Sequence, residues 1–338
     1  MKAIRLHDVR DLRVHTEAAP IPEGRFNTLL KISSIGICGS DLHWFDEAGI
    51  GDAKLKRPLV LGHEFAAVVE SGPLKGKRVA VDPAIPCGLC EMCLAGHSNL
   101  CEHTIFSGHG TQDGAFREYM AWPEENLHTL PDSVSDDDGA LLEPLGVAIH
   151  AVDLAHLKTG MSVGIFGAGS IGLLSLQVAR ASGATDLYVT DRRQHRLDAA
   201  EEFGAQHTYV ANDDRTESQA ILADTNKRGV DVAIECAGDN AAVESAFAAV
   251  KPGGTVVLVG IPSDDRTAFT ASVARRKGLT IKMSRRMKRV YPRAIALVQR
   301  GLVNVSALVS QRFNLADTQQ AFEAAERREG LKIVVEAS

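Results

Sequence analysis

Residues 163–172 read Val-Gly-Ile-Phe-Gly-Ala-Gly-Ser-Ile-Gly, an apolar run that leads into three glycines spaced as G-x-G-x-x-G. The apolar run predicts a buried strand, and residues 173–181 predict a helix directly after the glycines. In such a unit the first glycine allows a tight turn, the second lets the backbone approach a diphosphate, and the third lets the helix pack on the strand. The N–H groups at the helix start would bind the diphosphate. The candidate loop residues are Gly167, Gly169, Ser170, Ile171 and Gly172.

The next apolar run, residues 187–191, ends in Asp191, 19 residues after Gly172. An acidic residue at that distance binds the ribose hydroxyls of a dinucleotide, so the loop and Asp191 together predict a dinucleotide site. The carboxylate would repel a 2′-phosphate, which favours NAD over NADP. Arg192 and Arg193 follow directly and could instead hold that phosphate, so NADP remains the alternative cofactor. The structural alternative to a cofactor site is a doubly wound sheet with an incidental glycine turn.

Strand-like and helix-like segments continue to alternate after this motif, as far as residue 283. Such alternation predicts βαβ units and a parallel sheet with helices on both faces, and we assign this α/β domain to residues 148–286. Residues 1–147 read as short strands broken by Gly, Pro and Asn, which predicts an irregular β-rich domain. The closing run, residues 331–337, predicts a strand that could return to the first domain, so we assign 287–338 to that domain. Two domains also suit the length of 338 residues.

Composition and charge exclude several kinds of partner. The chain is 45% hydrophobic and 24% charged, as globular proteins are, and its net charge of −6 gives no broad attraction to nucleic acid or anionic membranes. We therefore expect a small-molecule partner. The uncharged run 161–179 is explained by a strand, a glycine turn and a buried helix instead of a membrane span. The first residues lack the pattern of a secretory signal, so we expect a cytoplasmic protein.

Four of the six cysteines lie within 15 residues, spaced C-x2-C-x2-C-x7-C in a segment of about residues 86–102 that also holds Pro86 and Gly88. Four thiolates in a tetrahedral array form a closed structural zinc site, which stabilises a lobe and leaves no position for a substrate. Two disulfides are one alternative, and an iron–sulfur cluster is another because three closely spaced cysteines resemble ferredoxin spacing. The four cysteines are Cys87, Cys90, Cys93 and Cys101.

A second set of metal-binding side chains is spread along the first domain. It occurs in the segments CGSDLH (38–43), LGHE (61–64) and LEPLG (142–146). Cys, His and Glu are all zinc ligands, and three protein ligands with one open position form the catalytic type of zinc site. Each of these residues alone is more often a buried cysteine or a surface histidine. Sequence spacing by itself does not bring the three segments together.

These motifs in this order resemble the zinc-containing medium-chain dehydrogenases, and among them the sorbitol and L-idonate dehydrogenase branch. The resemblance runs nearly end to end, through CGSDLH, LGHE, the four-cysteine lobe, EPLGVAIHA, GAGSIG, VTD and LKIVV. It implies a GroES-like catalytic domain, a Rossmann cofactor domain, two zinc ions per chain and a homodimer or homotetramer. The implied activity is transfer of a hydride from a secondary hydroxyl of a polyol or sugar acid to NAD.

The resemblance also implies roles for single residues. Cys38 and His63 resemble catalytic zinc ligands, and Glu64 and Glu143 resemble carboxylates that compete for the remaining ligand position. Further resemblances concern a proton relay from Ser40 to His43, a contact of Arg196 with the adenosine side of the cofactor, and the backbone of Val259, Gly260 and Ile261 at the nicotinamide.

Two departures from the family concern the substrate. Trp44 stands where sorbitol dehydrogenases usually have a tyrosine, and Met287 follows Arg286 where they usually have an aromatic residue. Both positions line the substrate pocket in the family, which puts sorbitol itself in doubt. Four cations occur in residues 285–289, and an arginine suits bidentate binding of a carboxylate, so a sugar acid such as L-idonate is one expectation. A neutral polyol whose hydroxyl accepts from Arg286 is the other.

Two further functions remain open. An L-threonine 3-dehydrogenase would have similar zinc sites and a similar EPLG run, but those enzymes usually carry threonine where Ser40 stands. A non-catalytic NAD(P)-binding protein would keep the fold, but it would not need the ligand set of Cys38, His63 and Glu64.

Overall fold

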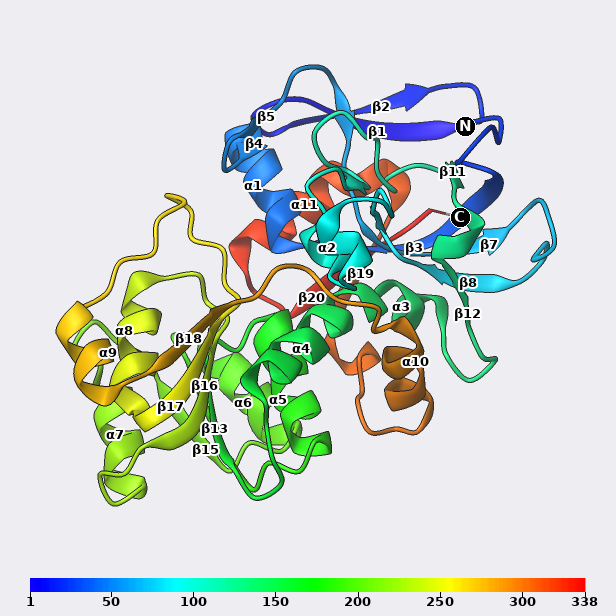
Figure 1. Cartoon of the computed structure of the whole chain (residues 1–338). Helices are drawn as coiled ribbons and strands as arrows, with labels where there is room; N and C mark the ends of the chain where they lie inside the picture. The colour runs from blue at the N-terminus through cyan, green and yellow to red at the C-terminus, as the bar shows by residue number, and fades with distance from the viewer. Residues whose placement is uncertain (338) are drawn as a thin grey trace. The chain divides into compact units, whose positions relative to one another are not determined.

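The computed structural model describes residues 1–337 and divides into two compact units, Met1–Glu143 with Lys288–Ser338 and Pro144–Met287. The first unit is β-rich, and the second contains a parallel sheet with its helices (Figure 1). The chain therefore has the α/β fold class that its sequence predicts, with a GroES-like and a Rossmann part. Helix α4 (Leu142–Ala155) contains the point at which the first unit ends and the second begins.

The main sheet of the first unit is built from strands that lie far apart in the sequence. Its order is β12-β8-β7-β3-β20-β19, and β11 also pairs with β3. Strand β20, near the end of the chain, lies antiparallel to β3, with Val335 opposite Ile35. The bounds are β3 (Thr28–Gly36), β7 (Glu64–Val69), β8 (Arg78–Val81), β11 (Tyr119–Trp122), β12 (Leu127–Thr129), β19 (Val309–Asn314) and β20 (Lys332–Glu336).

Smaller elements complete the first unit. A second sheet has the order β2-β1-β6, and two strand pairs, β4–β5 and β9–β10, lie in its loops. The strands are β1 (Lys2–Asp8), β2 (Asp11–Thr16), β4 (Gly49–Ile50), β5 (Ala53–Lys54), β6 (Leu59–Val60), β9 (Ala84–Ile85) and β10 (Ile105–Phe106). The helices are α1 (Gly39–Glu47), α2 (Glu91–Leu94), α3 (Asp136–Ala140), α10 (Tyr291–Gln299) and α11 (Thr318–Arg327), with short 3₁₀ turns at Ser98–Leu100, Glu124–Asn126, Ser306–Leu308 and Leu315–Asp317.

Phe45, Phe116 and Phe322 pack together in the core of this unit. The ring of Phe322 lies 5.3 Å from that of Phe45 and 5.3 Å from that of Phe116, measured between ring centroids. Phe322 belongs to α11, so the C-terminal part of the chain closes a core whose other members come from the N-terminal half. The C-terminal segment 315–337 thereby contributes to the first unit's core and is not an appendage.

The second unit is a six-stranded sheet with the order β15-β14-β13-β16-β17-β18, in which every neighbouring pair is parallel. Chain order reverses at β13, which has β14 on one side and β16 on the other. In such sheets ligands bind beyond the carboxyl ends of the strands at this reversal. The strands are β13 (Ser162–Phe166), β14 (Asp186–Asp191), β15 (His207–Val210), β16 (Val230–Glu235), β17 (Val250–Leu258) and β18 (Thr280–Met283).

Helices cover both faces of this sheet: α5 and α6 lie on one face, and α7, α8 and α9 on the other (Figure 1). They are α5 (Ser170–Ala181), α6 (Gln194–Glu202), α7 (Thr216–Asp224), α8 (Asn240–Ala249) and α9 (Ala271–Lys277). All five residues of β13 and most of α5 are buried, which explains the uncharged run at 161–179. Among residues 1–337, no helix has both the length and the apolar character that a membrane span needs.

Candidate metal and cofactor sites

Cys38, His63 and Glu64 come together because two neighbouring strands meet at one end. Strand β3 ends at Gly36, which lies opposite Glu64 at the start of β7. Cys38 follows β3 as the residue before α1, so its thiol lies beside the imidazole and the carboxylate. One ligand atom from each of the three residues lies within 4.8 Å of the others. This pairing supplies the proximity that sequence spacing could not predict.

Asp41 contacts both segments that carry these side chains, and it was not among the site residues predicted from the sequence. Its carboxylate is 1% exposed. One oxygen lies 3.3 Å from His63 Nδ1, and the other accepts the Cys38 N–H at 3.0 Å. A carboxylate at Nδ1 fixes the imidazole tautomer and leaves Nε2 for a metal ion. Burial disfavours the charged ring, but Asp41 and Cys38 raise the pKa of His63 well above its ordinary value.

Lys332 is the second residue that the sequence did not reveal. It begins β20, is 5% exposed, and places Nζ 2.5 Å from Glu64 Oε2 and 2.8 Å from the Ile37 carbonyl oxygen. Burial lowers its pKa, but Glu64 and Cys38 more than offset this, so the pKa is raised. Gly36 leaves room for the pair, because a Cβ atom there would lie 2.2 Å from Glu64 Oε2.

Glu143, on α4, is buried near this cluster but does not belong to the group of three ligands. Burial and the charges of Glu64 and Asp82 raise its pKa to about 8, although His63 and Lys332 oppose the shift. The site therefore gathers several buried acidic groups around one thiol and one imidazole. These are the side chains that bind zinc in proteins, so the group fits a zinc ion.

The four-cysteine lobe gathers its sulfur atoms as the spacing predicted, within 4.8 Å of one another. Backbone N–H groups donate to them, from Cys87 to Cys101 Sγ at 3.3 Å and from Cys90 to Cys87 Sγ at 3.3 Å. Burial opposes ionisation of Cys101, but such donors lower the pKa of this thiol to about 6. All six cysteines are free thiols in this structure. Four converging sulfurs with N–H donors fit a closed zinc site.

Two of the three glycines of the predicted phosphate loop, Gly167 and Gly172, have a steric reason. Gly167 has φ of +101°, and a Cβ atom there would lie 2.8 Å from the Ala237 nitrogen. Gly169 is the residue before α5, where helix N–H groups are available to a ligand. At Gly172 a Cβ atom would lie only 1.8 Å from the Gly167 carbonyl oxygen, so helix α5 packs against the turn at this point. Ser170 and Ile171 form the first turn of α5.

Asp191 ends β14 beside this loop. Its carboxylate accepts the Ala168 N–H at 2.8 Å and the Arg193 N–H at 2.9 Å. Arg196 lies near it, with a guanidinium nitrogen 3.7 Å from the carboxylate. Arg192 instead pairs with Asp213 at 3.1 Å. The loop and the carboxylate therefore lie at the carboxyl ends of β13 and β14, at the reversal of chain order.

The backbone of Val259, Gly260 and Ile261 lies at the same sheet edge, directly after β17. The Val259 N–H donates to the Glu235 carbonyl oxygen at 2.8 Å, and Gly260 is packed so closely on Gly238 that a Cβ atom would lie 2.1 Å from the Gly238 nitrogen. All predicted cofactor-binding segments thus lie beyond the carboxyl ends of one parallel sheet, where a dinucleotide fits.

Comparisons with known proteins agree with these two donor sets. Residues 24–132 match the family model of the alcohol dehydrogenase GroES-like domain, and residues 170–300 match that of the zinc-binding dehydrogenase. The sorbitol dehydrogenase of Bacillus subtilis (strain 168) is 37% identical over 345 residues, covering 99% of this chain and 97% of that protein. The chain belongs to the zinc-containing medium-chain dehydrogenases. It is therefore an oxidoreductase that uses zinc and a nicotinamide cofactor.

Two solved structures support this assignment. L-idonate 5-dehydrogenase from Escherichia coli K-12 MG1655 matches with a TM-score of 0.91 and 27% identity, covering 99% of this chain and 98% of that one. A zinc-binding dehydrogenase from Sinorhizobium meliloti 1021, solved bound to NADP, matches with a TM-score of 0.88 and 32% identity, covering 99% of both chains.

In this dehydrogenase the two predicted relay residues lie on α1 but make different contacts. Ser40 Oγ lies 3.4 Å from His63 Nε2, beside the metal ligands. His43 Nδ1 lies 3.2 Å from Glu47 Oε1 and is partly exposed. Within residues 1–337, no hydrogen bond joins Ser40 directly to His43. A proton that passes between them would need a bridging water molecule.

Aromatic rings extend from the metal ligands to the residue expected at the substrate. Trp44 is buried, and its ring meets that of His109 edge-on at 5.5 Å. Phe106 lies 5.3 Å from His63, again between ring centroids. Phe106 and His109 belong to no motif, so the sequence offered no signal for them. Arg286, also expected at the substrate, lies in the second unit after β18 and has a left-handed backbone with φ of +54°.

Proposed function

We propose that this dehydrogenase oxidises a secondary hydroxyl of a polyol or sugar acid and transfers the hydride to NAD. The observation that carries the proposal is the buried group of Cys38, His63 and Glu64, a ligand set for a catalytic zinc ion. The names of the related sorbitol dehydrogenase and L-idonate 5-dehydrogenase support this substrate class. The test measures NADH absorbance after the zinc-loaded enzyme receives NAD with sorbitol, L-idonate or L-threonine. Turnover of L-threonine alone would overturn the proposal.

The chain's own residues would divide the chemistry as follows. When bound, zinc supplies a Lewis acid for the hydroxyl group and nicotinamide accepts the hydride. Asp41 holds the His63 ring with Nε2 turned away from its carboxylate, and Lys332 restrains Glu64. Ser40 accepts the substrate proton at Oγ, because it lies beside the metal ligands, and passes it through water towards His43. An imidazole can both accept and donate a proton, which suits the outer end of such a relay.

We further propose two zinc ions per chain, one in each ligand set, and a preference for NAD over NADP. Asp191 supports the preference, because a buried carboxylate would repel a 2′-phosphate. Arg192 is engaged by Asp213, which makes it less available for that phosphate. The related structure was solved with NADP, which supports NADP as the alternative cofactor. The test compares kcat/KM for NAD and for NADP in wild type and Asp191→Ala. The ratio of the two values should be large in wild type and small in the variant.

The carboxylate-bearing substrate remains a proposal that depends on Arg286. A guanidinium can donate two parallel hydrogen bonds to a carboxylate, and these bonds are stronger than those it can donate to a hydroxyl group. The test compares kcat/KM for L-idonate and for L-iditol, the matching hexitol, in wild type and Arg286→Leu. A larger loss on the acid supports the proposal, and equal losses on both substrates would overturn it.

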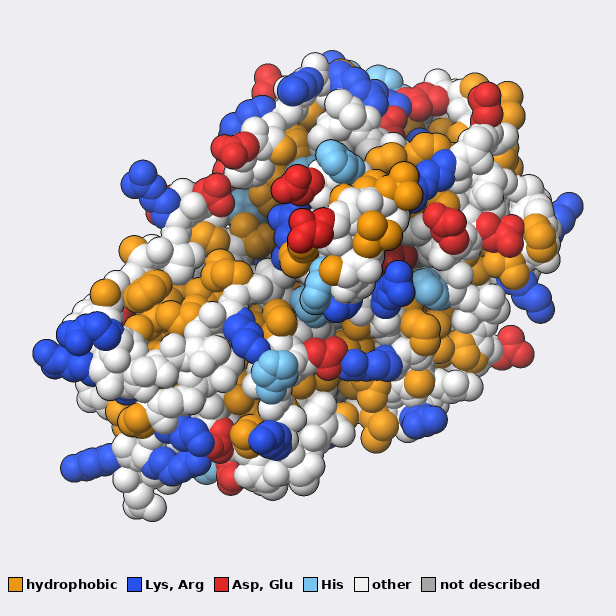
Figure 2. Space-filling view, in the orientation of Figure 1, with side chains coloured by type: hydrophobic (Ala, Val, Ile, Leu, Met, Phe, Trp, Pro, Cys, Tyr) orange, Lys and Arg blue, Asp and Glu red, His pale blue; other side chains and the backbone are white. Residues whose placement is uncertain are grey.

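A homodimer or homotetramer is the assembly that we propose. Strand β18 is an edge of the parallel sheet, and on it Ile281 and Met283 are 37% and 66% exposed. Hydrophobic side chains gather over this part of the second unit (Figure 2). An exposed edge strand with apolar side chains is a surface on which another strand can pair. Sedimentation should give an oligomer for wild type and a smaller species for Met283→Lys.

We also propose a cytoplasmic location, because thiolate zinc ligands need a reducing compartment.

A further inference from the structure

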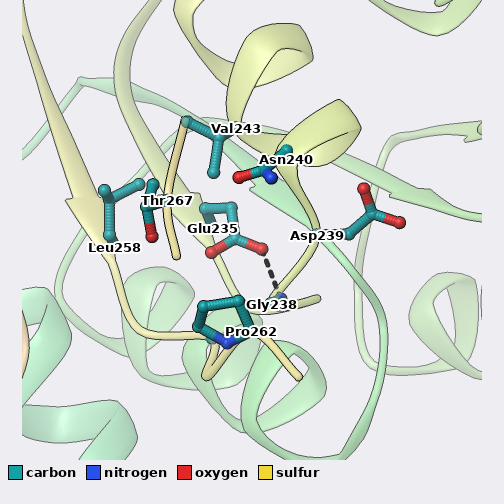
Figure 3. Close-up of a pocket in the computed structure, with 9 residues that line it drawn as sticks. Glu235, Gly238, Asp239, Asn240, Val243, Leu258, Pro262 and Thr267 are labelled. Atoms are coloured by element: carbon teal, nitrogen blue, oxygen red, sulfur yellow. Dashed lines mark hydrogen bonds between the residues drawn. The ribbon is translucent and has the colours of Figure 1, made fainter. Parts of the chain in front are cut away.

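Glu235 is a buried carboxylate for which no role has been assigned. It ends β16 and is 1% exposed. Within the described residues it makes no ion pair, and its Oε1 accepts the N–H groups of Ala237 and Gly238, both at 2.7 Å. Figure 3 shows the bond to Gly238. A buried charge is tolerated only where hydrogen bonds replace its hydration. Here backbone N–H groups of one turn do so, in place of a cation.

The same side chain also faces a second turn. A Cβ atom on Gly260 would lie 2.9 Å from Glu235 Oε2, so this oxygen is turned towards the segment after β17. The Glu235 carbonyl oxygen accepts from Val259 at 2.8 Å and from Gly260 at 3.2 Å. Burial raises the pKa of Glu235, and the N–H groups of Gly238, Ala237, Asp239 and Gly260 oppose this rise because they favour the charged form.

The two turns are in direct backbone contact. A Cβ atom on Gly238 would lie 2.5 Å from the Ile261 carbonyl oxygen, and Gly238 has φ of +70°. The two turns are therefore packed against each other, and one carboxylate lies beside both. Figure 3 shows Glu235 beside Gly238 and Pro262, at a small pocket that also includes Asn240 and Thr267.

We propose that Glu235 is a positioning residue for the nicotinamide end of the cofactor site, where its carboxylate fixes the backbone of residues 259–261. This inference rests on the proposed function, which assigns the nicotinamide to that backbone. Backbone groups that bind a ring must be held within about 0.5 Å of their bound positions. A carboxylate that accepts two N–H groups from the first turn and lies against Gly260 of the second provides this restraint, whereas the phosphate loop and Asp191 hold the other end of the cofactor independently.

The experiment compares two ligands that differ only at the nicotinamide. Isothermal titration calorimetry measures the binding of NADH and of ADP-ribose to the zinc-loaded full chain. Glu235→Gln keeps the size of the side chain but replaces one of its two acceptor oxygens with an NH2 donor, so one turn faces a donor instead of an oxygen. Glu235→Asp keeps the charge but is one methylene shorter. We expect Glu235→Gln to weaken NADH binding about tenfold and to leave ADP-ribose binding within about twofold, because an unpaired buried N–H group disturbs only its own turn. Glu235→Asp should do the same to a smaller extent.

Glu217→Gln provides the matched control. Glu217 is a buried carboxylate of the same unit and accepts a hydrogen bond from Ser245, away from both turns. It should change NADH and ADP-ribose binding equally or not at all. Equal losses of both ligands in Glu235→Gln, no loss of either, or failure of both Glu235 variants to fold would overturn the inference. A wild-type protein that binds neither ligand would refute the proposed cofactor function itself.

Discussion

Replacing Lys332 with methionine should destabilise the first unit strongly without zinc and weakly with zinc. In the wild type, Lys332 is the cation that lies 2.5 Å from the buried Glu64 carboxylate. Methionine removes this charge and keeps most of the volume. The remaining carboxylate would be buried without a counter-charge, and loss of one partner of a buried pair costs about 3–5 kcal/mol. A zinc ion that binds Glu64 supplies the missing charge.

In the zinc-loaded variant, the main loss is then the hydrogen bond from Lys332 to the Ile37 carbonyl oxygen. A hydrogen bond of a charged group contributes about 1.5–3 kcal/mol. The difference between the two states, about 2 kcal/mol, must appear as tighter zinc binding, since both quantities belong to one thermodynamic cycle. We therefore expect Lys332→Met to bind the catalytic zinc roughly thirtyfold more tightly than the wild type.

The chain suits a selective assay. Trp44 and Trp122 are its only tryptophans, and both are buried in the first unit, so their fluorescence follows unfolding of that unit. Urea titrations of wild type and variant, with zinc and after chelation, give the four free energies of unfolding. The lobe loses its zinc in both proteins alike, so this contribution cancels.

Arg312→Met is the control, because Arg312 pairs with Asp137 at 2.8 Å in the same unit but is 49% exposed. An exposed pair contributes about 0–1 kcal/mol, with no dependence on zinc. An equal loss for Lys332→Met with and without zinc would refute the reasoning, because Glu64 would then not respond to the metal.

Three further predictions follow from single sites. Cys90→Ser should lower stability and zinc content, whereas Cys38→Ser should abolish turnover with the fold intact, and metal analysis with circular dichroism separates the two outcomes. Ser40→Ala should slow oxidation more than His43→Ala does, since water replaces the outer relay member more easily; equal rates for wild type and Ser40→Ala would remove the relay. Burial lowers the pKa of His128, so at mildly acidic pH this side chain binds a proton in the unfolded chain more readily than in the folded chain. Stability should then fall as the pH drops through about 6.5, and His128→Phe should reduce this loss in urea titrations.

The sequence predicted the fold class and the cofactor loop well because the signals are local. Gly167 and Gly172 lie within one strand–turn–helix unit, where Gly167 has a positive φ and the close contact of Gly172 is with Gly167 itself. Asp191 ends the next strand, so its place beside the loop follows from the order of a doubly wound sheet. The four-cysteine lobe is also local, within 15 residues.

Residues that act across the sheet of the first unit could not be predicted in this way. Lys332 reaches Glu64 only because β20 pairs with one edge of β3 while β7 pairs with the other, a neighbourhood that no spacing encodes. Asp41 lies inside a recognised segment, but its contacts with His63 and with the Gly62 N–H depend on the packing of the segment before β7 beside α1. Glu235 ends a strand that the sequence indicated correctly, and its role depends on a turn more than 20 residues away.

Both sites must hold their ligand-binding groups in place, and each does so with a buried carboxylate. In the first unit, Asp41 contacts the ligand-bearing segments through His63 Nδ1 and the Cys38 N–H. In the second, the Glu235 carboxylate accepts two N–H groups from one backbone turn and lies against Gly260 of another. Each carboxylate is 1% exposed, and each would raise the free energy of the fold if its donors moved away. Any displacement of the neighbouring donor groups is therefore unfavourable, because it leaves the buried charge without hydrogen bonds. A metal ion and a nicotinamide ring would thus meet donors that are already held in place, which reduces the ordering that binding requires.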